Sequence, residues 1–122
     1  TYADLEESDV LVFVGANPCI AHPILWERVC RNRRKPAIVV IDPRRTETAM
    51  AASLHVPLRP KSDLTLLYGL VRGVIERGWV DESFVAEHTR GYDELAAHAL
   101  AFTDERVAEA TGLPVETLTA LL

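Results

Sequence analysis

The sequence has few cysteines and no long apolar run, and both shortages restrict what the chain can be. Only two cysteines, Cys19 and Cys30, occur in 122 residues, so neither a disulfide framework nor a four-cysteine zinc site fits. No apolar stretch approaches the roughly 20 residues that span a bilayer. No basic and apolar leader is visible at the start. We therefore expect reduced thiols, no membrane insertion and a cytoplasmic protein.

A basic excess and glycine-rich motifs are also missing. The net charge of −5 argues against a general nucleic-acid binder. None of the six glycines belongs to a G-x-G-x-x-G or G-x-x-x-x-G-K-[ST] motif, which disfavours an ordinary NAD or GTP site. Nine of the thirteen basic residues nevertheless lie between Arg28 and Lys61. Those at 31–35 suit the carboxyl end of a helix. Four others lie in expected loops, where an anion can use them: Arg44, Arg45, Arg59 and Lys61.

Two short apolar runs, 10–14 and 37–41, predict strands buried on both faces, as in a parallel sheet. Turn residues follow the first run at 15–18, and a helical pattern then begins at Pro23 and stops before Pro36. Strand, loop, helix and strand together make a βαβ unit of about 30 residues. A third strand is expected over 54–58, at an edge of the sheet because of Pro57.

Helical patterns account for most of the remaining chain. A helix over 64–75 is expected to be capped by Ser62 or Asp63 and to close near Gly78. Asp81 and Asp104 are expected as N-caps and Pro114 as a first helical residue. The other expected helices are 3–7, 46–52, 81–88, 93–102, 104–111 and 114–122.

These elements predict an α/β fold. We expect a Rossmann-like three-layer domain with a short, mostly parallel sheet, helices on both faces and a helical C-terminal part. A single domain over 1–122 is expected, with a sheet-and-helix core over 1–80 and the helical part over 81–122. A chain of this length hides roughly two-thirds of its unfolded surface, which is enough for one core.

In an open α/β sheet, ligands bind outside the carboxyl ends of the strands. The loops 15–22 and 42–46 occupy this position. Gly15 lets the backbone approach a ligand, and His22 can orient the loop. Asp42, directly after the second strand, suits ribose hydroxyls or a base edge, and Arg44 suits a phosphate or a base. Two alternatives remain open: a plain strand-to-helix turn for the first loop, and a surface pairing of Asp42 with Arg44 or Arg45.

No catalytic set is apparent in the sequence. The serines lack the G-x-S-x-G setting of a nucleophile elbow. No two histidines have the spacing of a metal site such as H-E-x-x-H. We therefore expect neither a catalytic residue nor a metal ligand in this chain. The four histidines are His22, His55, His88 and His98.

Four stretches, in this order and spacing, make the sequence recognisable. They are GANP at 15–18 with His22 and Pro23, IDPRRTETA at 41–49, LRPKSDL at 58–64, and GWVDESFV at 78–85 followed by HTRGY at 88–92. Together they resemble the molybdopterin oxidoreductases of the dimethyl sulfoxide reductase family. That family includes nitrate reductases and formate dehydrogenases, and the resemblance covers nearly the whole chain.

The resemblance implies one domain of a much larger enzyme, which binds the guanosine and phosphate end of molybdopterin guanine dinucleotide. Asp63 would accept the guanine N1 and N2 donors, which adenine cannot supply. The other implied contacts are Gly15, Ala16 and Asn17 at the phosphates or sugar, with Asp42, Pro43 and Arg44 around the guanosine.

The resemblance also implies what the full-length enzyme does. Its partners are the remaining domains and a small-molecule substrate, and its iron–sulfur cluster lies outside this chain. Ile20 and the pair His88–Thr89 favour nitrate reduction over formate oxidation. Lys61 departs from the family, which usually has glycine there. The alternative of another class is a stand-alone nucleotide-binding or structural module.

Overall fold

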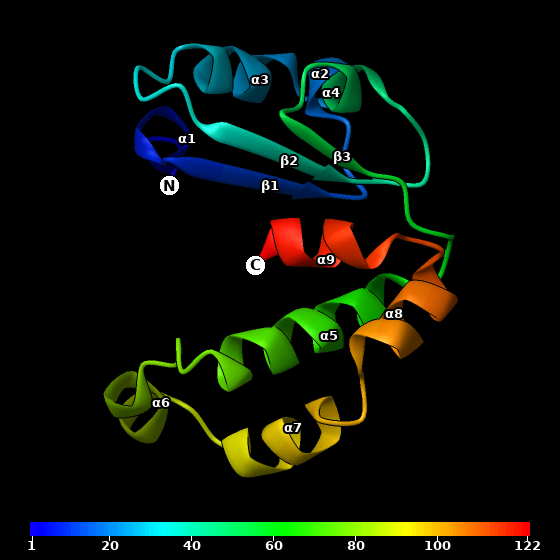
Figure 1. Ribbon diagram of the computed structural model, residues 1–122. Helices are drawn as coiled ribbons and strands as arrows, with labels where there is room; N and C mark the ends of the chain where they lie inside the picture. The colour runs from blue at the N-terminus through cyan, green and yellow to red at the C-terminus, as the bar shows by residue number, and fades with distance from the viewer. The chain divides into compact units, whose positions relative to one another are not determined.

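The chain alternates strands and helices in its first half and is helical afterwards (Figure 1). The computed structural model describes all residues, Thr1–Leu122. They form two compact units, Thr1–Leu58 (unit 1) and Arg59–Leu122 (unit 2). The expected α/β class, with a parallel sheet and a helical C-terminal part, is confirmed. The helix expected over 64–75, which was assigned to the sheet-and-helix core over 1–80, lies in unit 2.

Unit 1 contains a three-stranded sheet made of β1 (Val10–Val14), β2 (Ala37–Ile41) and β3 (Leu54–Val56). The strand order is β1-β2-β3, and both pairings are parallel, as predicted. β3 lies at the edge and ends two residues earlier than expected. Pro57 has no N–H for the ladder, and the Leu58 N–H donates to the Val56 carbonyl at 3.0 Å, which turns the chain away.

The two faces of β1 differ in burial. Leu11 is buried, and the ring of Phe13 lies 6.1 Å from that of Trp26, on the side covered by the unit 1 helices. The expectation that β1 is buried on both faces is wrong, because no unit 1 helix packs on its other face. The valines of that face are about half exposed: Val10, Val12 and Val14.

Unit 1 has four short helices, all on one side of the sheet (Figure 1). Pro23 is the first residue of α3, as predicted, and α3 stops six residues before Pro36. One helix, α2, was not predicted, because Gly15, Asn17 and Pro18 around its start are typical turn residues. The bounds are α1 (Asp4–Glu7), α2 (Pro18–Ala21), α3 (Pro23–Cys30) and α4 (Glu47–Met50).

Unit 2 is built from five helices. The predicted N-cap Asp81 is confirmed, since its carboxylate accepts the Phe84 N–H at 2.9 Å. The predicted cap Asp104 is wrong: Thr103 accepts the Arg106 N–H, and Asp104 is the first helical residue. None of the helices combines the length and apolar character that crossing a bilayer requires. The bounds are α5 (Asp63–Glu76), α6 (Glu82–His88), α7 (Tyr92–Ala99), α8 (Asp104–Thr111) and α9 (Val115–Leu121).

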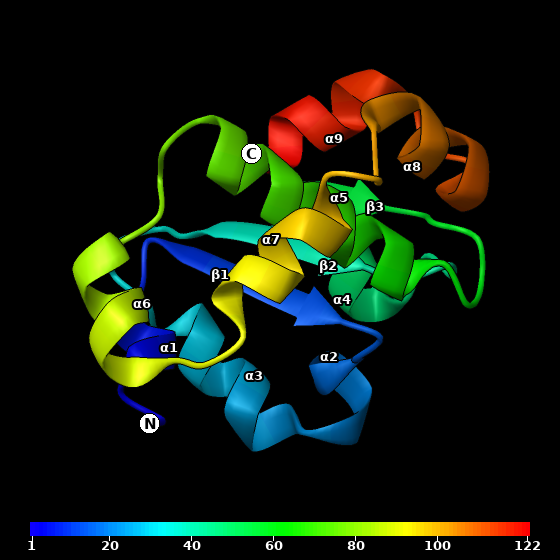
Figure 2. The same cartoon turned by 90° about the horizontal axis from the view of Figure 1, so that it is seen from below.

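α5 is the central helix of unit 2. The ring of its Tyr68 lies 4.7 Å from that of His98 in α7 and 4.8 Å from that of Phe102, which follows α7, and Figure 2 shows α7 beside α5. On the side facing α8, Gly69 leaves room for Val107, a fully buried residue. Pro114, expected inside the last helix, precedes α9 with an extended backbone.

Candidate functional site

The loops that follow β1 and β2 meet at one edge of the sheet. Val14 and Ile41, the last residues of the two strands, are register partners. The Gly15 N–H continues the pairing and donates to the Ile41 carbonyl at 2.9 Å. Gly15 has φ +58°, and an added Cβ would meet nothing within 4 Å. Glycine is therefore favoured here by the backbone conformation, not by a lack of space.

Asp42 is almost fully buried, with 5% of its surface exposed, although it carries a carboxylate. One carboxylate oxygen accepts the Arg44 backbone N–H at 2.8 Å. His55 Nε2 lies 2.9 Å from the Asp42 carbonyl, so this nitrogen carries the proton and donates. Neither Arg44 nor Arg45 makes a side-chain ion pair with Asp42. The alternative of a surface ion pair is therefore wrong, and the carboxylate is fixed by a backbone turn.

Three residues of the second loop are exposed at the same edge: Pro43, Arg44 and Arg45. Neither guanidinium group forms an ion pair, although the pKa of the Glu47 carboxyl, lowered mainly by a hydrogen bond from Asn17, is lowered further by the charge of Arg44. Both groups therefore remain available to a phosphate or another anion. Thr46 next to them is buried, and its hydroxyl accepts the Ala49 N–H at 3.2 Å as the N-cap of α4. Thr46 therefore begins a helix.

The Asn17 side chain makes three hydrogen bonds inside unit 1. Its Oδ1 accepts both the Thr48 hydroxyl at 2.8 Å and the Thr48 backbone N–H at 3.2 Å. Its Nδ2 donates to a carboxylate oxygen of Glu47 at 2.8 Å. This amide donor, with the backbone N–H of Glu47 itself, holds the pKa of the Glu47 carboxyl below its usual range. The contact therefore has an ionised acceptor at neutral pH.

The first loop also contains Ala16 and His22, and both are exposed. His22 lies between α2 and α3, and its ring caps neither helix. One short helix, α2, therefore lies within this loop, before α3 begins at Pro23. Among all residues, no three His, Cys, Asp or Glu side chains are grouped so that they could hold a metal ion.

The remaining predicted residue, Asp63, belongs to unit 2. It is the exposed first residue of α5. Ser62, one of its expected caps, is buried, and its hydroxyl donates to the Arg59 carbonyl at 2.6 Å instead of capping α5. Arg59 in turn donates through Nη1 to the Glu109 carbonyl at 2.6 Å, near the end of α8. That Asp63 joins the loops of unit 1 remains a prediction.

Lys61 has a backbone conformation that favours glycine. Its φ is +70°, in the left-handed region that a side chain makes costly. We expect Lys61→Gly to raise the free energy of unfolding by about 0.5–1 kcal/mol, because relief of this strain exceeds the added entropy of the unfolded chain. Urea unfolding of wild type and variant measures the change. Lys61→Ala is the control and should leave stability nearly unchanged, since alanine keeps the strain.

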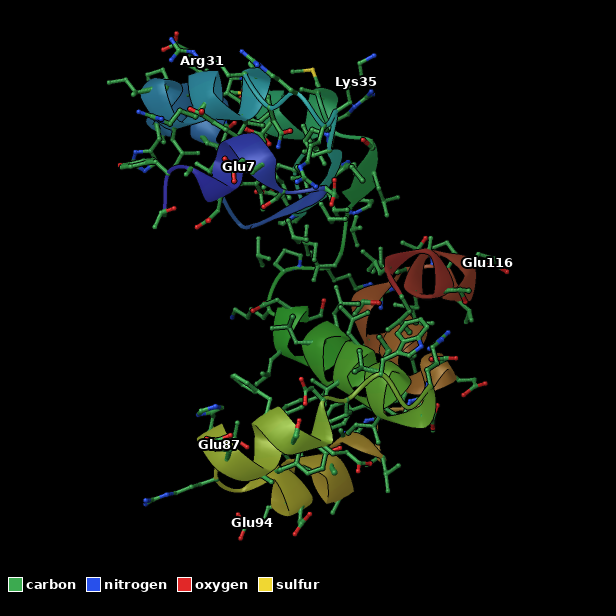
Figure 3. The ribbon with its side chains drawn as sticks, turned by 90° about the vertical axis from the view of Figure 1, so that its left-hand side faces the viewer. Glu7, Arg31, Lys35, Glu87, Glu94 and Glu116 are labelled. Carbon is green, nitrogen blue, oxygen red and sulfur yellow. The ribbon has the colours of Figure 1, made fainter.

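Two arginines of the basic run at 31–35 form ion pairs within unit 1. Arg31 pairs with Glu27 at 2.6 Å and Arg34 with Asp9 at 3.2 Å. Figure 3 shows Arg31 and Lys35 at the outer surface, with their side chains pointing into solvent. The run follows α3, which ends at Cys30, and this agrees with its interpretation as a solvated helix end.

The fold and this edge define a class: an α/β protein whose candidate ligand site lies at the carboxyl ends of parallel strands. Comparison with known proteins gives the family. A family model described as molybdopterin oxidoreductase matches residues 1–113. The chain therefore belongs to the molybdopterin oxidoreductase family.

Individual relatives agree with this assignment. The chain is 39% identical to a nitrate reductase of Shewanella frigidimarina, over 97% of this chain and 13% of that protein. It is 38% identical to the alpha subunit of F420-dependent formate dehydrogenase 2 of Methanococcus maripaludis, over 94% of this chain and 17% of that protein. Among solved structures, acetylene hydratase from Pelobacter acetylenicus aligns with a TM-score of 0.83 and 26% identity, over 96% of this chain and 16% of that one. The chain thus corresponds to a small part of each relative.

Proposed function

We propose that this chain binds the guanosine and phosphate end of molybdopterin guanine dinucleotide within a larger molybdenum oxidoreductase, and that it performs no turnover alone. The observation that carries the proposal is the meeting of two loops at one sheet edge, where the buried Asp42 is followed in the same loop by the exposed Arg44 and Arg45, which form no ion pair. Family membership supplies the class of cofactor.

The residues present fit such a ligand. Asp42 offers carboxylate oxygens to ribose hydroxyls or a base edge, and its backbone turn orients them before binding. Arg44 and Arg45 offer guanidinium donors to phosphates. Gly15 and Ala16 present an exposed backbone without bulky side chains. When bound, the cofactor supplies two-electron chemistry at its molybdenum, and the residues named here hold its nucleotide end.

Asp63→Ala in the full-length enzyme tests the guanine contact. We expect guanine nucleotide and molybdenum per polypeptide to fall roughly tenfold, because two N–H donors of guanine lose a charged acceptor. Acid release and quantification of guanine nucleotide, with metal analysis, measure both. Asp93→Ala is the matched control, since Asp93 is also an exposed aspartate in the first turn of a unit 2 helix.

The outcomes separate two failures. Unchanged nucleotide and molybdenum in Asp63→Ala would remove Asp63 from the site and leave the two loops of unit 1 in it. Wild-type enzyme that contains molybdenum but no guanine nucleotide would overturn the proposed function as a whole.

For the reaction of the full-length enzyme we propose nitrate reduction, supported by Ile20 and the pair His88–Thr89 and by the nitrate reductase relative. Formate oxidation is the second candidate, because a formate dehydrogenase subunit is 38% identical to this chain. An assay of nitrate reduction by a reduced dye and of formate oxidation by an oxidised dye decides between them. Formate oxidation without nitrate reduction would overturn the first choice.

A further inference from the structure

The side chain that connects the two loops of the candidate site is Thr48, which lies in α4 and is fully buried. Its hydroxyl donates to Asn17 Oδ1 at 2.8 Å and accepts the Cys19 backbone N–H at 3.2 Å. Its backbone N–H donates to the same Asn17 oxygen at 3.2 Å. Thr48 thus links the chain after β1 to the helix that follows the loop after β2.

Thr48 acts together with two other contacts, from Asn17 Nδ2 to Glu47 and from the Gly15 N–H to the Ile41 carbonyl. α2 and α4 have four residues each, and helices of one turn have little stability of their own. The two helices lie beside each other in Figures 1 and 2. Because the Thr48 hydroxyl is buried, it cannot exchange its partners for water. Its loss leaves the Cys19 N–H without its acceptor and Asn17 Oδ1 with the Thr48 backbone N–H alone.

We propose that Thr48 is a positioning residue for the dinucleotide-binding edge. Its hydroxyl holds the Gly15–Asn17 loop at the spacing from Asp42 and Arg44 that the ligand requires, and Thr48 itself does not contact the ligand. Asn17 Oδ1 accepts both Thr48 donors, so Asn17 is the residue through which Thr48 holds the first loop. The inference rests on the proposed function and adds the contact that sets the geometry of the binding edge.

Thr48→Val in the full-length enzyme tests this role, because valine keeps the shape and removes the hydroxyl. We expect guanine nucleotide and molybdenum per polypeptide to fall about tenfold. Turnover per bound molybdenum should stay unchanged, because Thr48 touches no reacting group. Thr48→Ser restores the hydroxyl and should restore the content. Amide hydrogen exchange at Cys19 should quicken in Thr48→Val and not in Thr48→Ser.

Thr111→Val is the matched control. Thr111 is also fully buried, and its hydroxyl donates to the Val107 carbonyl and accepts the Leu113 N–H, away from both loops in the sequence. Nucleotide content that falls equally in Thr48→Val and Thr111→Val would overturn the positioning role while the proposed function stands. Wild-type enzyme without guanine nucleotide would overturn both.

A second variant covers the case in which Thr48→Val does not fold. Asn17→Ala removes the partner of the hydroxyl from a side chain that is only half-buried. It should lower the nucleotide content by a similar factor and speed exchange of the Thr48 amide. Normal nucleotide content in folded Asn17→Ala would contradict the proposed role of the contact.

Discussion

Gly69→Val is expected to lower the free energy of unfolding of this chain by about 3 kcal/mol. A Cβ built on Gly69 would lie 2.6 Å from Cγ2 of Val107, well inside contact distance. Val107 is fully buried and β-branched, so its methyl cannot rotate away without displacing α8. Gly69→Ala gains helix propensity and still has the clash, and we expect a loss of about 1–2 kcal/mol. Urea unfolding measures both variants.

Gly73, one turn later in α5, provides the matched control. Its added Cβ would meet a terminal methyl of Leu122 and the Arg77 guanidinium, the far ends of flexible side chains. We therefore expect Gly73→Ala to change stability by less than about 0.5 kcal/mol, since helix propensity offsets a small rearrangement. Val107→Ala should partly rescue Gly69→Ala. Equal losses at Gly69 and Gly73 would contradict the assignment of the clash to Val107.

The strands could be predicted because a short apolar run rich in β-branched residues rarely forms any other element. Ala37–Ile41 shows this best: every residue is apolar, and Val40 and Ile41 are buried as expected. The same pattern predicted burial for Val10, Val12 and Val14, which was wrong. An apolar run indicates that a strand can be buried. How many of its faces are covered depends on which elements pack on them, and no unit 1 helix packs on the second face of β1.

The position of the candidate site could be predicted from parallel pairing alone, since that pairing brings the carboxyl ends of β1 and β2 to one edge. The hydrogen bonds between Asn17 and Thr48 could not be predicted from the sequence. The two residues are 31 positions apart, and either could have faced solvent or a ligand. Only the placement of α4 against α2 decides that they bond to each other. Within unit 1 the Asn17 side chain bonds to Thr48 and Glu47, and the contact of the Gly15–Asn17 loop with the ligand stays a prediction.

Lys61 shows the opposite relation between sequence and structure. The family resemblance pointed to this position as a departure from glycine, and the structure supplies the physical reason for the glycine, a φ of +70°. The residue types next to Lys61 do not indicate that its φ is positive. The strain is located in the Arg59–Asp63 segment, which leads directly to the proposed guanine acceptor and makes Lys61 a useful position to vary.

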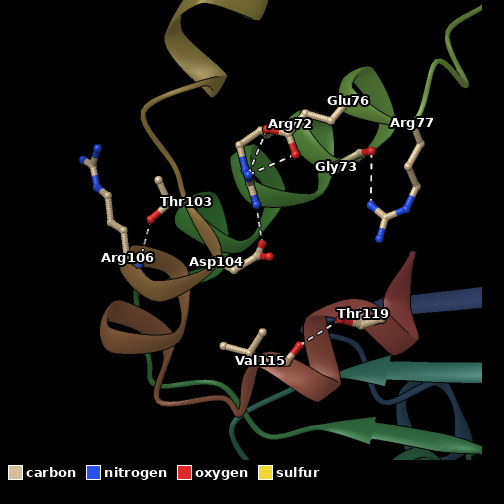
Figure 4. A network of polar contacts seen from close by, with 9 residues as sticks. All are labelled: Arg72, Gly73, Glu76, Arg77, Thr103, Asp104, Arg106, Val115 and Thr119. Atoms are coloured by element: carbon tan, nitrogen blue, oxygen red, sulfur yellow. Dashed lines mark hydrogen bonds and ion pairs between the residues drawn. The ribbon is translucent and has the colours of Figure 1, made fainter.

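Arg72→Ala is expected to lower the free energy of unfolding by about 2–3 kcal/mol. Arg72 lies on α5 with only 12% of its side chain exposed. It donates to both carboxylate oxygens of Glu76, at 2.9 and 3.0 Å, and to Asp104 at the start of α8 (Figure 4). The pair with Asp104 joins segments 32 residues apart. The two acids are roughly half exposed, so water compensates them in part, and the expected loss stays below that of a fully buried pair.

Arg72→Met separates the charge of Arg72 from its packing. Methionine keeps an apolar stem, and it also removes the buried Nε, which has no hydrogen-bond partner. We therefore expect Arg72→Met to cost only about 1 kcal/mol, with the difference from alanine due to packing between α5 and α8. A double-mutant cycle of Arg72→Met with Asp104→Asn, followed by urea unfolding, measures the coupling of the pair. A cycle with no coupling, together with equal losses for methionine and alanine, would show that neither the ion pair nor the stem holds α8 to α5.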